Sequence, residues 1–152
     1  MKTILLILSI IALGFNSLAQ AGKLKKADNY YSKLAYSYAA PLYEELIGSE
    51  VDSPKLKSKL ASSYYNMGDM INAEKYYAQM ISSNEATKED FFFYAQALKQ
   101  IGNYTESDRW MAKVNDTAQA DLRGISFIEN SSYVQQIEKQ GIRFTINNLS
   151  IN

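Results

Sequence analysis

The sequence predicts an all-α solenoid of about three helical hairpins, followed by a C-terminal capping helix and a short β-prone tail. Apolar residues recur at offsets of three and four along most of the chain, which is typical of helices that pack through one face. The same residue types also return every 34 residues, as at Ala27, Ala61 and Ala95. A generic helical bundle would explain the amphipathic helices but not this fixed recurrence, so the solenoid is favoured.

The second helix of each hairpin is predicted from an apolar stripe that keeps the same register in all three repeats. The stripe opens at Ala39, Ala73 and Ser107. At each of three further positions of the stripe, the equivalent residues of the three repeats belong to one size class. These three sets are Leu42, Tyr76 and Trp110; Tyr43, Tyr77 and Met111; and Leu46, Met80 and Val114.

Capping residues and glycines predict where the helices begin and end. Ser53 before Pro54 and Thr87 before Asp90 are typical helix starts. Ser37 and Thr105 are the expected caps of the second helices in the first and third hairpins, and a cap at Ser37 would place Pro41 in the first turn. Gly68 and Gly102 mark two tight turns.

The C-terminal part departs from the period. Residues 117–140 are predicted to form two capping helices, the first over 119–129 with Leu122, Ile125 and Ile128 on its packed side. From 141 to 152, Ile142, Phe144 and Ile146 alternate with polar residues, as in a strand. This tail either folds back weakly or leads into a further β domain.

The first 19 residues are expected to be a signal peptide. Lys2 precedes an apolar run over residues 3–15, and Ser17-Leu18-Ala19 before Gln20 fits a cleavage site. A retained anchor is disfavoured because the run is short. The mature repeat domain is therefore expected over residues 20–116 of a periplasmic protein, with no membrane span after cleavage.

Composition argues against most catalytic and nucleic-acid functions. The chain has 16 basic and 16 acidic residues, so its formal net charge is zero and no field favours a polyanion. It has no Cys and no His, which removes thiolate chemistry and the usual zinc ligands. We expect no cofactor, no metal and no enzymatic activity. A carboxylate-based hydrolase is the remaining catalytic alternative, but Glu44-Glu45 and Glu89-Asp90 are interpreted as surface and helix-start charge.

Residues 21–115 resemble the tetratricopeptide repeat, through the series Ala61, Tyr64, Gly68, Ala73 and Tyr77. The chain departs from that pattern in lacking its tryptophan, which is replaced by lysine and phenylalanine, and in having Leu34 at the first turn glycine. The whole string, from ADNYYSKLAY to IRFTINNLSIN, is similar to the N-terminal periplasmic region of OmpA-family envelope proteins of Bacteroidetes. That resemblance implies an exported module of outer-membrane machinery.

The resemblance to tetratricopeptide proteins also implies a binding site, because their first helices line a concave groove. Phe92 is expected to be exposed there beside a buried Phe91, and the partner is a protein or peptide. The alternative is a structural spacer, the N-terminal fragment of a peptidoglycan-tethering protein. The positions transferred to this chain are Asp28, Tyr31, Ser32, Ser58, Ser62, Tyr65, Asn66, Phe92, Gln96, Lys99 and Gln100.

Overall fold

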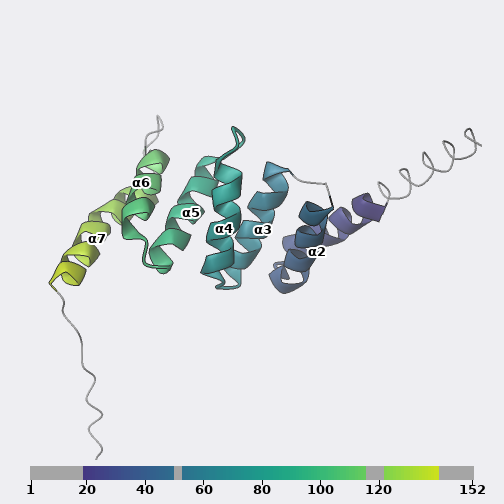
Figure 1. Ribbon diagram of the computed structural model, residues 1–152, viewed down its shortest axis with the longest axis horizontal. Helices are drawn as coiled ribbons and strands as arrows, with labels where there is room; N and C mark the ends of the chain where they lie inside the picture. Colours follow the sequence, from purple (N-terminus) through teal and green to yellow (C-terminus); the bar gives the residue numbers. More distant parts are fainter. Residues whose placement is uncertain (1–18, 50–52, 116–121, 141–152) are drawn as a thin grey trace, which may run out of the picture.

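The computed structural model describes residues 19–49, 53–115 and 122–140, and within these ranges the chain forms helices and tight turns without a strand. Figure 1 shows the helices standing side by side in one row. A first helix covers residues 19–32 and is followed by α2 (Tyr36–Gly48), α3 (Pro54–Asn66), α4 (Met70–Ile81), α5 (Lys88–Gln100), α6 (Tyr104–Asn115) and α7 (Leu122–Lys139). None of the described helices is both long and apolar enough to cross a membrane.

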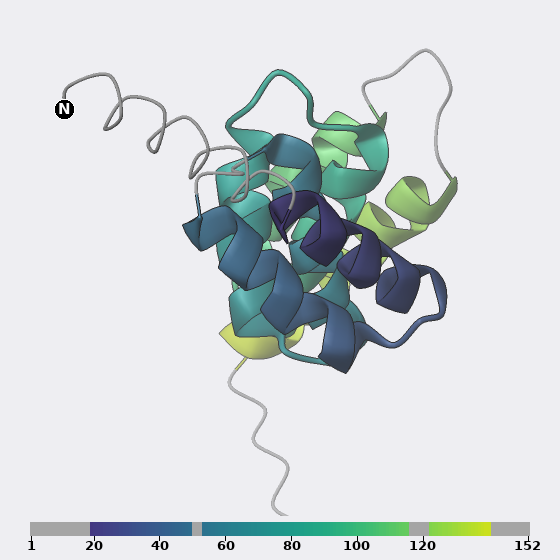
Figure 2. The same cartoon turned by 90° about the vertical axis from the view of Figure 1, so that its right-hand side faces the viewer.

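The row is a stack of antiparallel hairpins. Helices α2 to α7 each pack against their neighbours in the chain, and α3 also contacts α5, the first helix of the next hairpin. Figure 2, turned by a quarter rotation, shows that the helices do not surround a common centre and overlap along the stacking direction. This is the α-solenoid that the sequence predicts.

The 34-residue register is confirmed by burial. Ala27, Ala61 and Ala95 are each completely buried, and they lie in three successive hydrophobic clusters. Most residues of the apolar stripes of the second helices are buried in the same way, whereas Leu42, Tyr76 and Trp110 are half-buried. The fully or almost fully buried members are Ala39, Tyr43, Leu46, Ala73, Tyr77, Met80, Ser107, Met111 and Val114. Small residues at the alanine positions let neighbouring helices approach closely, while the larger residues fill the layers between them.

The turn within each hairpin has one geometry in all three repeats. Leu34, Gly68 and Gly102 occupy the same repeat position with φ values of 59°, 81° and 84°. In each turn the next residue donates its backbone N–H to a carbonyl five residues earlier, at distances of 2.9 to 3.0 Å. A leucine therefore adopts the left-handed conformation that glycine supplies in the other two repeats.

This common turn corrects two predicted helix starts. α2 begins at Tyr36 with Ala35 as its N-cap residue, and α6 begins at Tyr104, so Ser37 and Thr105 lie inside the helices and do not cap them. Since the turn sets where the second helix starts, the cap position follows the repeat and not the nearest hydroxyl residue. The predicted caps of the first helices are confirmed: Ser53 accepts from Leu56, and Thr87 forms a capping box with Asp90.

The earlier start of α2 places Pro41 beyond the first turn. Its missing N–H removes the donor that the carbonyl of Ser37 would have four residues further along the helix. Ser37 is exposed, so water can reach this carbonyl, and the helix continues through the proline to Gly48.

Helix α7 caps the stack as predicted, but it is one continuous helix and its packed side differs from the prediction. Gly124, Phe127 and Ser131 are buried, and a Cβ at Gly124 would meet the side chain of Asn115 on α6. The predicted stripe of Leu122, Ile125 and Ile128 is exposed. The apolar stripe misled the prediction because the surface under α7 requires a close helix approach at Gly124. Residues 1–18 of the predicted signal peptide and the predicted tail at 141–152 lie outside the described residues.

Candidate partner-binding face

The predicted groove residues come from the first helices of the hairpins, namely residues 19–32, α3 and α5. We call the surface that these helices share the first-helix face. Across the face, side chains of successive helices bond to one another, and the bonded residues are 31 or 32 apart in sequence. The solenoid thus brings the predicted positions of neighbouring repeats into direct contact.

Asp28 joins the first helix to α3. Its Oδ1 accepts hydrogen bonds from the Lys59 ammonium at 2.6 Å and from the Tyr43 hydroxyl at 2.7 Å. Burial disfavours the charged carboxylate, but these hydrogen bonds and the charge of Lys59 outweigh it, so the pKa of Asp28 is lowered. Beside this pair, the Tyr31 hydroxyl donates to Ser62 Oγ at 2.9 Å.

Asp90 joins α3 to α5. It is a buried carboxylate whose two oxygens accept hydrogen bonds from two different elements. Oδ1 accepts from the Ser58 hydroxyl on α3, and Oδ2 accepts from the backbone N–H of Thr87, the N-cap residue of α5, at 2.9 Å. The capping box of α5 therefore also ties α5 to the preceding hairpin. Asp90 was predicted only as a capping residue, and nothing in its spacing shows the link to Ser58.

Contacts that involve aromatic rings connect α3 to α5 and α5 to α7. The Tyr65 ring meets Phe93 edge-on at 5.0 Å between centroids, and the Lys99 ammonium lies 4.2 Å from the Phe127 ring centroid. Phe127 belongs to α7, so the face is closed at this end by the capping helix.

Phe92 contradicts its predicted exposure. The side chain is buried with Ala95, Met111, Val114 and Phe127, and the Arg123 guanidinium lies 4.3 Å from its ring centroid. Helix α7 covers it, while Phe91 at the preceding position is only half-buried. Phe92 is therefore a core residue.

The remaining predicted residues lie at the surface of the same helices. Ser32 donates to the carbonyl of Asn29, Asn66 donates to the carbonyl of Ser62, and both side chains are exposed. Gln96 is half-buried on α5 and Gln100 is exposed at its end. The predicted set therefore divides into inter-helix links and a smaller group that solvent reaches.

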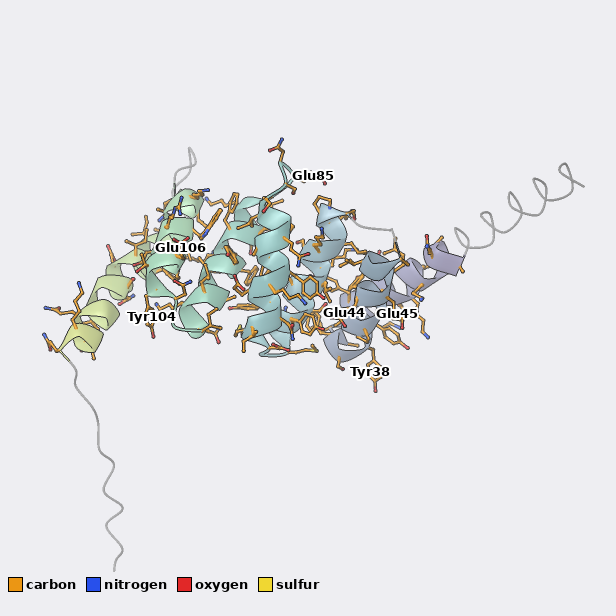
Figure 3. All side chains as sticks on the ribbon, viewed as in Figure 1. Tyr38, Glu44, Glu45, Glu85, Tyr104 and Glu106 are labelled. Carbon is orange, nitrogen blue, oxygen red and sulfur yellow. The ribbon has the colours of Figure 1, made fainter. Side chains whose placement is uncertain are left out.

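Two pockets open on this face, one on each side of Lys55. The first, of about 140 Å³, lies between the helix over 19–32 and α3, and Asp28, Lys55 and Lys59 contribute to its wall. The second, of about 270 Å³, lies between α3 and the start of α5, and Lys55, Glu85 and Asp90 line it. Figure 3 labels Glu85 on the connection after α4.

Lys55 and Lys59 are functional candidates that the sequence interpretation missed. They lie on α3 with Ser58 and Ser62, at offsets of three, four and seven that place all four on one side of the helix. That spacing was the available signal. Lys55 is exposed and lines both pockets, whereas Lys59 is committed to Asp28.

Comparison with solved structures identifies the architecture. The second TPR domain of human RPAP3, in complex with an HSP70 peptide, superposes with a TM-score of 0.65 at 14% identity over 77% of this chain and 98% of that one. This chain has a tetratricopeptide-like fold. Yeast Tom70 gives a TM-score of 0.71 at 14% identity over 82% of this chain and 26% of Tom70. The Sgt2 TPR domain of Aspergillus fumigatus gives 0.65 at 12% identity, covering 87% and 89% of the two chains.

No protein-family model matches the chain, and no curated relative matches it significantly. The structural likeness concerns the fold. Within the described residues, no group of three or more acidic side chains is arranged to hold a metal ion. The first-helix face carries hydrogen-bonding and charged groups around the two pockets that flank Lys55.

Proposed function

We propose that the chain is a non-enzymatic scaffold that binds an extended peptide segment of a protein partner along the first-helix face. The observation that carries this proposal is the pair of pockets flanking Lys55. An extended segment presents alternate side chains to one surface, so two neighbouring pockets can each receive one of them. The links through Asp28, Ser62 and Asp90 hold the three helices in place before binding, which lowers its entropic cost.

The charges around the pockets favour a particular kind of peptide. The two walls contain Asp28, Glu85 and Asp90 as well as Lys55 and Lys59. The RPAP3 domains are bound to the acidic-ended peptides SGPTIEEVD and SRMEEVD. Such an end would meet carboxylates here and be repelled. We therefore expect a neutral or mixed-charge segment to bind this face better than an EEVD peptide.

Selection from a displayed library of random peptides, followed by affinity measurement on the selected sequences, tests the proposal. We expect Lys55→Glu to weaken the selected peptides about tenfold, because it reverses the charge between the pockets. This corresponds to about 1.4 kcal/mol. Lys33→Glu is the matched control, since Lys33 is exposed in the turn between the first two helices, away from both pockets.

Equal affinities in the two variants would place binding elsewhere on the molecule. Failure to enrich any peptide over the double variant Lys55→Glu/Tyr65→Ala would remove the peptide-binding function itself. A preference for SRMEEVD over neutral sequences would contradict the charge argument but leave the face as the site.

We also propose that the scaffold is exported to the periplasm and acts in an outer-membrane or secretion-associated assembly. The apolar run over residues 3–15 and the small residues before Gln20 support this. N-terminal sequencing of the protein from a cell-envelope fraction should find Gln20 as the first residue. Recovery of the chain in the cytosol with Met1 intact would contradict export.

The second candidate function is a spacer, in which the solenoid holds a following domain of an OmpA-family peptidoglycan-tethering protein. The alternation of apolar and polar residues over 142–146 favours it, because this pattern suits the start of a following β domain. An open reading frame that continues beyond codon 152 into a peptidoglycan-binding domain would support the spacer.

A further inference from the structure

Helix α7 takes the place of the first helix of a fourth hairpin. α3 and α5 begin at Pro54 and Lys88, 34 residues apart, and the described part of α7 starts one period further along, at Leu122. α7 is tied to α5 as α5 is tied to α3: both guanidinium nitrogens of Arg123 donate to the carboxylate of Glu89, at 3.2 and 3.0 Å. The repeat therefore continues structurally past the third hairpin.

The outer side of α7 carries residues that are covered in the preceding hairpin. Ile125 and Ile128 are 36% and 38% exposed. One period earlier stand Phe91 and Tyr94, whose rings pack on Trp110 of their own second helix at 5.6 and 5.4 Å. Ile125 and Ile128 thus occupy positions that elsewhere contact a second helix, and no described element contacts them in that way.

Two further exposed residues extend this surface. Leu122 is 78% exposed and Tyr133 64% exposed. At 100° per residue, these two and the two isoleucines fall within an arc of roughly 140° on α7. We call these four residues the outer α7 surface.

The other end of the stack is different. On the helix over residues 19–32 the exposed side chains are charged, polar or small, among them Lys25, Lys26 and Asn29. Terminal elements of solenoids need a polar outer side to remain soluble. The first helix meets that requirement, and α7 as described does not.

We infer that residues 141–152 of the same chain run back along α7 and cover the outer α7 surface. The segment starts immediately after the helix, so its local concentration is high. In extended form its Ile142, Phe144 and Ile146 face one side, while Arg143 and Thr145 face the other. Its twelve residues reach roughly 40 Å, which exceeds the length of about 27 Å for the 18 residues of α7.

Simple geometry sets the register of this contact. An extended chain advances about 3.3 Å per residue and a helix about 1.5 Å, so each tail residue passes about two helical residues. With the chain reversing at Gly141, Ile142 would lie near the C-terminal end of α7, Phe144 near Tyr133 and Ile146 near Ile128. Two of the large apolar residues of the tail would therefore meet residues of the outer α7 surface.

Cysteine cross-linking tests the register directly, because the chain has no native cysteine. In the full chain, Ile128→Cys with Ile146→Cys should form an intrachain disulfide under mild oxidation. The matched control keeps the tail cysteine and pairs it with Asn29→Cys at the opposite end of the stack. Equal cross-linking in the two pairs would overturn the inference.

Alkylation supplies a second readout that does not depend on register. A single Ile125→Cys should react at least tenfold more slowly in the full chain than in a chain that ends at Gln140. Far-UV circular dichroism should show the same helix content in both. Equal rates would overturn the inference, and so would disulfides formed between chains with a dimer mass, since a second copy would then cover the surface.

Discussion

At the scale of single residues, Leu34 shows how strongly the repeat dictates the backbone. It has a φ of 59°, at the position where Gly68 and Gly102 have 81° and 84°. The same backbone hydrogen bond closes all three turns, from Ala35 to Tyr30, from Asp69 to Tyr64 and from Asn103 to Leu98. The packing of the flanking helices therefore holds a leucine in a conformation that costs a non-glycine residue about 1–2 kcal/mol.

Leu34→Gly should stabilise the protein by about 0.5–1 kcal/mol, because the relief of this strain exceeds the added entropy of the unfolded chain. The leucine side chain is 70% exposed, so little packing is lost. The measurement is the free energy of unfolding from urea titration. Gly68→Ala should lower it by about 0.5–1 kcal/mol, because the same strain is offset in part by the reduced entropy of the unfolded chain, and since nothing lies within 4 Å of the added Cβ, the loss reports the backbone alone. A destabilised Leu34→Gly would contradict the assignment of strain.

At the scale of elements, helix starts also act as joints between hairpins. The Thr87 hydroxyl oxygen accepts a hydrogen bond from the backbone N–H of Asp90. In turn, the Asp90 carboxylate accepts from the backbone N–H of Thr87 and from the Ser58 hydroxyl on α3. One carboxylate thus caps α5 and fixes its position against α3. Ser58, Thr87 and Asp90 also line the larger of the two pockets beside Lys55, so the shape of that pocket depends on this joint.

Thr87→Ala should cost about 1 kcal/mol, the usual contribution of an N-cap side chain. Thr87→Ser keeps the accepting oxygen, so it should retain most of the stability that Thr87→Ala loses. Thermal unfolding followed by circular dichroism measures both. If Thr87→Ala and Thr87→Ser proved equally destabilised, the effect would come from lost packing of the methyl group and not from capping.

At the scale of the whole molecule, the abundant tyrosines predict a stability limit at high pH. Burial raises the pKa of the Tyr43, Tyr64 and Tyr77 hydroxyls, and nearby carboxylates raise it further, while burial and Glu74 raise the pKa of Tyr94 to about 12. These groups hold their protons more tightly in the folded chain than in the unfolded one. Their contribution to stability is therefore complete below pH 10 and is lost as the pH rises above it.

We expect the last part of the rise in phenolate absorbance to coincide with the loss of helix content as the pH is raised above about 10, because the buried tyrosines ionise only when the chain unfolds. Tyr43→Phe should shift this transition to higher pH by removing one of the responsible groups. Tyr38→Phe is the control, because Tyr38 is exposed and should leave the transition unchanged. Full ionisation of the tyrosines with retained helix would contradict the expectation.

The period of the chain was sufficient to predict the solenoid, its core and two of its helix caps. Alanine and tyrosine recur at fixed positions because identical contacts recur, and a local pattern records such contacts. The predicted site residues all lie on the first helices. Asp28, Tyr31, Ser58 and Ser62 also serve as links between repeats, and Phe92, predicted to be exposed, is buried beneath α7.

The sequence by itself determined the hairpin register, because helical periodicity and the 34-residue repeat are properties of neighbours along the chain. Only the tertiary structure decided which polar residues bond to one another and which remain open, since Asp28 and Lys59, or Ser58 and Asp90, meet only when hairpins stack. The same holds for α7, where contact with α6 at Gly124 turned Phe127 inward and left Ile125 and Ile128 outside. A helix can bury only the side on which its backbone comes close enough, and that closeness is set by the surface beneath it.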